Sequence, residues 1–303
     1  MASDMKWLLI AAVATILTIV GPLLVLLAAF TGITNSAGER YFSCQCDSAI
    51  GPDPSVTEAA APGSSVCDSD EEWDPADVPT TNPFLSMTPA PDATEISDYQ
   101  RACLSAISSA SAPLQVPALR RTNAGFAVEC ARELAYARVG SRADGSASAA
   151  VVRDVIYEAS LAAVSTGSCA VGSRTDGASG GAVPRAEPGT TAPIGSCGPT
   201  TPQAAVALPD TIAGQGLCGQ RVRSDAVSPG DLVFWDYRDN APTRVGIAVE
   251  PTRVIATDPD TGEYTAGYMR VVAADPATGE FAVLDVSSDS DARAKRVLAG
   301  EPN

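Results

Sequence analysis

The segment SPGDLVFW at residues 228–235 decides the fold, because a tight turn there leads directly into a β-strand. Its PGD portion, residues 229–231, has turn chemistry, and residues 232–235 are apolar and β-prone. The polar connection at 236–243 is followed by a second apolar segment, RVGIAV at 244–249. This pattern predicts a β-hairpin whose strands are neighbours in a small antiparallel sheet.

The sequence after the hairpin continues in the same way. Strands are predicted at 253–257, 268–274 and 281–286, and Asp-Pro turns at 258–262 and 275–279 separate them. These strands predict an antiparallel meander.

Three stretches before the hairpin have helical periodicity. Residues 95–112 follow this pattern with Ser97 as the N-cap, and residues 123–139 follow it with Asn123 as the N-cap. Residues 151–164 carry a third apolar stripe. Helices followed by consecutive strands favour an α+β fold, with the helices packed on the sheet.

Charge and composition exclude several classes of function. The chain has 303 residues and a formal net charge of −16, which argues against binding to nucleic acids or attraction to anionic lipids. Histidine is absent from the whole sequence. The most common general base of enzymes is therefore missing.

The N-terminal segment is strongly apolar. Residues 7–30 form an uninterrupted uncharged run, long enough to span a bilayer. We interpret it as an uncleaved signal anchor rather than a cleaved signal peptide, since a cleaved peptide has a shorter apolar region and a small-residue cleavage site. Residues 1–6 are then cytoplasmic, and the rest of this single-pass protein of the cell membrane is extracytoplasmic.

Cysteine usage agrees with this orientation. All eight cysteines follow the apolar run, and their even number predicts disulfides in an oxidising compartment. They are Cys44, Cys46, Cys67, Cys103, Cys130, Cys169, Cys197 and Cys218. The competing hypothesis is a zinc site at Cys44-x-Cys46, which lacks a second close pair of ligands.

These patterns divide the chain into five parts. The predicted parts are a cytoplasmic N-terminus at 1–6, a transmembrane anchor at 7–30, an irregular linker at 31–94, a domain at 95–286 and a polar, frayed tail at 287–303. The domain carries an insertion at about 165–202 that is rich in Gly, Ser and Pro.

Three separate motifs in one order resemble the NlpC-type papain-like peptidases of bacterial cell walls. They are DGSASAAVV at 144–152, LPDT at 208–211 with Gln215 after it, and the hairpin itself. The family pattern is DGFDCSGLV, then LPRTS with a later Gln, then PGDLVFF and HVGIY. The resemblance covers roughly residues 123–286 and implies a papain-like domain.

The resemblance also implies that every catalytic residue has been replaced. The family's cysteine nucleophile falls on Ser148, its histidine base on Arg244, and the residue that orients the histidine on Ala256. Arginine remains protonated in proteins and cannot act as a base. A free Cys130 or Cys169 is the alternative nucleophile, although a disulfide role is favoured for both.

We therefore expect a pseudoenzyme that needs neither a cofactor nor a metal. Arg244 and Trp235 are the candidate binding residues, for the acidic stem peptide of peptidoglycan or for a protein partner in the cell envelope. One alternative is an active peptidoglycan endopeptidase with relocated catalytic residues. Another is a structural surface protein that does not bind the wall.

Overall fold

The predicted hairpin is present and lies inside a larger sheet. Strand β2 (Leu232–Arg238) pairs antiparallel with β3 (Ala241–Ala248), and Phe234 lies opposite Val245. The connection is tighter than expected, because both strands extend to a two-residue turn. Asp239 and Asn240 in that turn both have positive φ, as the common two-residue hairpin turns require.

The computed structural model describes most of the chain after residue 41 but not the N-terminal segment. The described residues are 42–55, 67, 84, 96–108, 118–143, 147–165, 167–169, 205–257, 259, 264–288 and 291–300. The predicted anchor at 7–30 lies outside them, as does most of the insertion at 165–202. Within the described ranges, no helix combines the length and the hydropathy that a membrane span requires.

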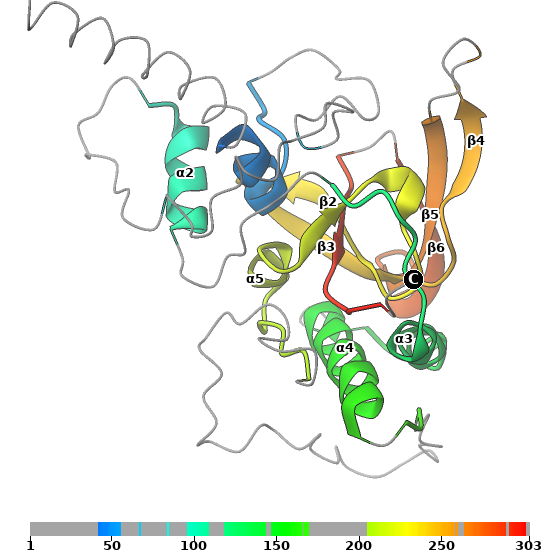
Figure 1. Cartoon of the computed structure of the whole chain (residues 1–303). Coiled ribbons are helices and arrows are strands. Elements are labelled where there is room, and N and C mark those ends of the chain that lie inside the picture. Colours follow the sequence, from blue (N-terminus) through cyan, green and yellow to red (C-terminus); the bar gives the residue numbers. More distant parts are fainter. Residues whose placement is uncertain are drawn as a thin grey trace, which may run out of the picture. The chain divides into compact units, whose positions relative to one another are not determined.

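The sheet has seven strands, and all of its paired strands are antiparallel (Figure 1). Its order is β1, β7, β2, β3, β5, β4, and β6 also pairs with β5. The remaining bounds are β1 (Gln220–Val222), β4 (Arg253–Thr257), β5 (Tyr264–Asp275), β6 (Glu280–Ser287) and β7 (Arg293–Arg296). The three strands predicted after the hairpin are confirmed as β4, β5 and β6.

The predicted polar tail at 287–303 is wrong for residues 293–296, which form β7 between β1 and β2. Ala294 pairs with Val222 on one side and with Val233 on the other. Ala294 and Lys295 are both buried. Backbone pairing with two strands, rather than an apolar pattern, holds this charged segment in the sheet.

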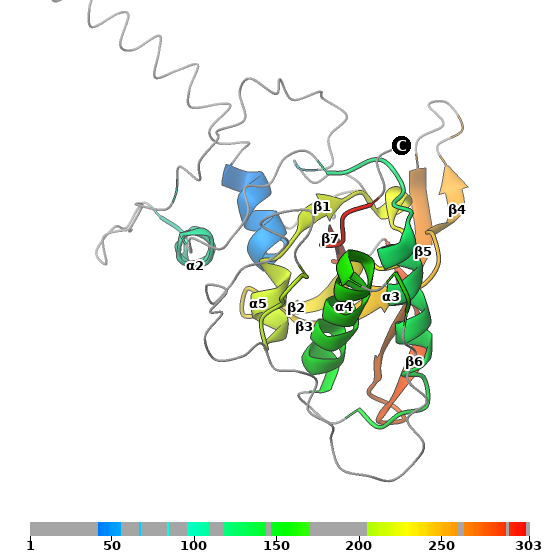
Figure 2. The same cartoon turned by 60° about the horizontal axis from the view of Figure 1, so that its bottom comes forward.

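Two helices cover one face of the sheet (Figure 2). They are α3 (Phe126–Tyr136) and α4 (Ala147–Ser165), and their buried side chains share one core with Phe234 of β2. Helix α3 begins later than predicted, and its N-cap is Gly125 rather than Asn123. Asn123 instead bonds to the Ser228 hydroxyl and the Leu298 carbonyl, since its backbone N–H and side-chain amide face those groups.

The opposite face of the sheet has a core of its own. Because side chains alternate along a strand, Val233 and Trp235 lie on this second face, while Leu232 and Phe234 face the helices. The 3-10 turn η2 (Ser224–Ala226) contributes Ala226 to the second core. Both faces of the sheet are therefore buried over residues 232–235 and 245–248 of the hairpin.

The predicted irregular linker at 31–94 contains a helix at 42–50. Cys44, Cys46 and Ile50 of this helix are buried. Asp47 on the same helix accepts three bonds from the Arg293 guanidinium, at 2.7, 3.0 and 3.1 Å. The prediction missed this helix because composition favoured a linker, whereas disulfides to Cys67 and Cys103 and a partly buried ion pair with β7 stabilise these residues.

Disulfides are confirmed. Cys44 is bonded to Cys67, Cys46 to Cys103 and Cys130 to Cys169, so the zinc hypothesis for Cys44 and Cys46 is wrong. Cys218 is also disulfide-bonded, and Cys197 lies outside the described residues. No cysteine in the described ranges is free. The Cys46–Cys103 bond joins the helix at 42–50 to α2 (Asp98–Ile107), which Ser97 caps as predicted.

Gly51 provides a test of how the segment after this helix packs. Its φ is +86°, and an added Cβ would lie 2.3 Å from Cδ1 of Tyr237. We expect Gly51→Ala to lower the free energy of unfolding by about 1–3 kcal/mol in urea denaturation. Gly140→Ala is the matched control, because its φ is +81° but no atom lies within 4 Å of the added Cβ. Equal losses in the two variants would contradict the packing argument.

Candidate functional site

Ser148, the position of the family's nucleophile, lies in the first turn of α4 and is half-buried. The start of α4 is fixed by Gln215, whose Nε2 donates to the carbonyls of Ala149 and Pro209, both at 2.8 Å. Gln215 is fully buried on α5 (Ile212–Gly216), which Thr211 caps. The LPDT motif and its later Gln therefore form one local structure with the helix that carries Ser148.

Arg244, the position of the family's base, lies on the other face of the sheet. It is directly opposite Trp235 in the β2–β3 register, so both side chains are on the face remote from α4. The Arg244 Cζ atom lies 4.9 Å from the Trp235 ring centroid, within cation–π range. Its Nη2 donates to the Ala274 carbonyl at 2.8 Å. These contacts give Arg244 a packing role.

Ala256 lies far from Arg244 along β5. It pairs with Ala266 of β5, whereas Arg244 contacts Ala274 of the same strand. Eight residues of a strand correspond to about 26 Å. The structure thus does not bring Ser148, Arg244 and Ala256 together, and the catalytic arrangement that the resemblance implied is not formed.

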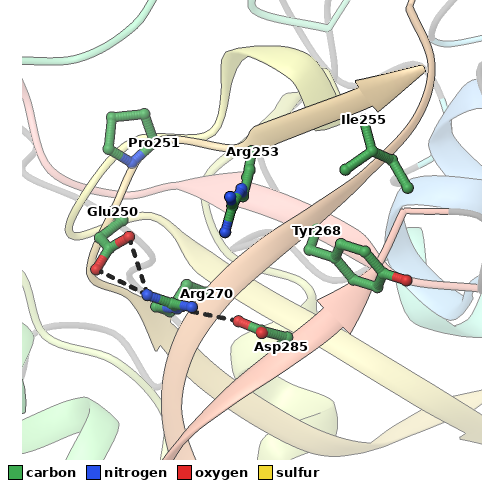
Figure 3. Close-up of a pocket in the computed structure, with 7 residues that line it drawn as sticks. All are labelled: Glu250, Pro251, Arg253, Ile255, Tyr268, Arg270 and Asp285. Atoms are coloured by element: carbon green, nitrogen blue, oxygen red, sulfur yellow. Dashed lines mark hydrogen bonds and ion pairs between the residues drawn. The ribbon is translucent and has the colours of Figure 1, made fainter.

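A different group of side chains surrounds an open pocket next to the hairpin of β4 and β5 (Figure 3). We call it the arm pocket, and its volume is about 240 Å³. It is lined by Glu250, Pro251, Arg253, Ile255, Tyr268, Arg270 and Asp285.

An ion-pair network fixes one side of the arm pocket. Arg270 Nε donates to Asp285 at 3.0 Å, and its Nη1 contacts both carboxylate oxygens of Glu250 at 3.3 and 3.4 Å. Tyr136, the last residue of α3, donates its hydroxyl to Glu250 at 3.4 Å. Burial, followed by the Glu250 charge, raises the pKa of Tyr136, so the hydroxyl keeps its proton at neutral pH.

The other side of the pocket carries Arg253. Its guanidinium points from β4 over the pocket, and no described residue forms a hydrogen bond or an ion pair with it (Figure 3). Tyr268 lies opposite Arg253 in the β4–β5 register, and Ile255 follows on β4. The pocket therefore combines an available cation, exposed apolar surface and an acidic wall on which Arg270 balances one of the two carboxylate charges.

The sequence did contain a signal for this pocket. Tyr268 and Arg270 lie two residues apart on a predicted strand, and Arg253 begins the strand before it. Alternation places Tyr268 and Arg270 on one face of β5, but Asp285, the partner of Arg270, comes from the next strand and depends on register.

Comparisons with known proteins identify no relative. No family model matches the chain, and searches of curated proteins and of solved structures gave no match.

Proposed function

We propose that this protein is a membrane-anchored, extracytoplasmic, catalytically inactive relative of the NlpC-type peptidases, which binds cell-wall peptide or an envelope protein partner without cleaving it. The observation that carries the inactive part is the place of Arg244. It stacks on Trp235 on the face opposite α4, so the family's base position is occupied by a packing residue.

The absence of a histidine from the sequence, and of an accessible lysine from the described residues, supports the same conclusion. The sequence has no histidine, and the one described lysine, Lys295, is buried on β7. A serine hydroxyl without a base is a poor nucleophile, and loss of a nucleophile–base unit costs about a millionfold in turnover.

The relationship to the family is supported by the Gln215 contact and opposed by the position of Ala256. Gln215 joins the LPDT motif to the first turn of α4, which connects two of the three motifs in space. In contrast, β5 rather than β4 pairs with β3, so Ala256 cannot orient a group at residue 244. We therefore infer a shared fold without the family's catalytic geometry.

The binding part of the proposal rests on the arm pocket. Its charged and apolar side chains suit a peptide that carries both charged and apolar groups. Arg244 and Trp235 are less suitable, because their mutual contact and the bond to Ala274 already use their binding groups.

The first test uses the full chain, purified in detergent and incubated with sedimented peptidoglycan. We expect retention above that of a control protein, and no soluble fragments released from the wall. Ser148→Ala should change neither result, because Ser148 has no base.

The outcomes separate the alternatives. Hydrolysis that is abolished by Ser148→Ala would replace the proposal with an active endopeptidase. No retention would remove wall binding and leave only an envelope protein as the partner.

A further inference from the structure

The size of the arm pocket limits what it recognises. Its volume of about 240 Å³ lies below the range of about 300–1,000 Å³ that is typical of sites for whole small molecules. A pocket of this size accommodates a single residue of a peptide. Recognition must therefore depend on the groups that one residue carries.

The two arginines of the pocket have different roles. Arg270 pairs with both Glu250 and Asp285, so its single positive charge is already taken up by carboxylates of the protein. Arg253 has no such partner among the described residues, and its planar fork suits a carboxylate. An anionic ligand group would bind at Arg253 without breaking an ion pair of the protein.

Part of the pocket lining beside Arg253 is apolar. Ile255 is 55% exposed and Tyr268 is 41% exposed, and both line the pocket beside Arg253 (Figure 3). Pro251 adds a third apolar contact. Neighbouring exposed apolar side chains that surround a polar anchor indicate a contact surface.

We propose that the arm pocket binds the C-terminal residue of an extended peptide, whose free carboxylate pairs with Arg253 and whose apolar side chain packs on Ile255 and Tyr268. A pocket that holds one residue requires both recognised groups on that residue. A C-terminal apolar residue carries a carboxylate and an apolar side chain together. An internal Asp or Glu supplies a carboxylate but no apolar side chain. This inference rests on the proposed binding function and identifies the group that is recognised.

The experiment measures binding of a fluorescent hexapeptide, Gly-Ser-Gly-Ser-Gly-Leu, to the full chain in detergent. The peptide with a free C-terminus should bind about three- to tenfold more tightly than its C-terminal amide, as expected for one partly exposed charged pair. Arg253→Gln should remove that difference, because the glutamine has no charge to pair with the carboxylate. Arg253→Lys should retain part of it.

Arg142→Gln is the matched control, because Arg142 is an exposed arginine outside the pocket and should leave the preference unchanged. A third peptide, with an internal Glu and an amidated C-terminus, should bind no better than the version with Gln. Tighter binding of the Glu peptide, equal binding of acid and amide, or no binding at millimolar peptide would overturn the inference.

This inference and the proposed function fail in different ways. Peptide binding that depends on Arg253, without retention on peptidoglycan, would uphold the inference and reject wall binding. Retention that is equal in wild type and Arg253→Gln would uphold wall binding and reject the inference.

Discussion

Replacing Arg296 with methionine is expected to lower the free energy of unfolding by about 3–5 kcal/mol, because it leaves a buried carboxylate without its cation. Asp231, in the turn that begins β2, is 1% exposed. Both of its carboxylate oxygens accept bonds from Arg296 at 2.8 Å, and one also accepts from the Ser228 backbone N–H at 2.9 Å. The pair joins this turn to β7.

The loss of unfolding free energy in Arg296→Met should depend on pH. Burial raises the pKa of Asp231, and the Arg296 guanidinium opposes that rise. Without Arg296 the pKa rises further, so the folded variant takes up a proton more readily than the unfolded chain does. The deficit is then largest at neutral pH and shrinks as the pH falls toward the ordinary carboxyl range.

Urea denaturation of the wild type and the variant between pH 4 and 8 measures this effect. The double variant Arg296→Met with Asp231→Asn is the control, and it should recover part of the loss because no charge remains buried. A deficit that is independent of pH, with no recovery in the double variant, would show that packing alone is responsible.

The second large effect is a gain in stability. Lys295→Met should raise the free energy of unfolding by about 2–4 kcal/mol at pH 7, since a buried amine is replaced by an apolar side chain of similar length. Lys295 is fully buried, and its Nζ has no hydrogen-bond partner among the described residues. It lies opposite Arg221 of β1, and the charges of Arg221, Asp47 and Arg293 act on it.

The gain in unfolding free energy from Lys295→Met should fall as the pH rises. Burial, followed by the charge of Arg221, lowers the pKa of Lys295 to about 7, whereas an unfolded chain has the ordinary value of 10.5. Between these two values the unfolded chain holds a proton that the folded protein lacks. The stability of the wild type therefore rises with pH across this window, by about 1.4 kcal/mol per pH unit. Below the window, Lys295 makes the stability neither rise nor fall with pH.

Chemical denaturation at pH 6, 7, 8 and 9 measures the difference between the two proteins. The advantage of Lys295→Met should be constant between pH 6 and 7 and should then decline steadily. Raised pKa values of Tyr99 and Tyr237 place their titration above this range. An advantage of the same size at pH 7 and pH 9 would contradict the assignment to a buried amine.

Local patterns predicted local structure well. The hairpin, the three strands after it and α2 with its Ser97 cap all follow from residues that are close in sequence. The disulfides followed from the number of cysteines and their position after the apolar run. The partners of each cysteine did not, because pairing depends on where distant segments meet.

Strand β7 and the helix at 42–50 were missed for a common reason. Each contains a charged residue that is partly buried in an ion pair with the other segment, as Arg293 of β7 meets Asp47 of the helix. Single-sequence patterns treat such residues as exposed. The stabilising contact joins positions that no local window contains.

The expected proximity of Ser148, Arg244 and Ala256 depended on the order of the strands in the sheet. The resemblance placed the orienting residue on the strand that follows β3 along the chain. In the structure β3 and β4 pair with successive parts of the same strand, β5, so Ala256 is carried away from residue 244. The sequence contained the strands but not their order in space.

The position of β7 has a consequence for how the protein matures. Strand β1 pairs with β7 and not directly with β2, so the sheet stays divided until residues 293–296 arrive, after every other strand has been synthesised. An emerging chain therefore exposes two unfilled strand edges during translation, and such edges promote aggregation. Chaperones would have to shield the nascent polypeptide for longer than they would if its strands paired in the order of synthesis.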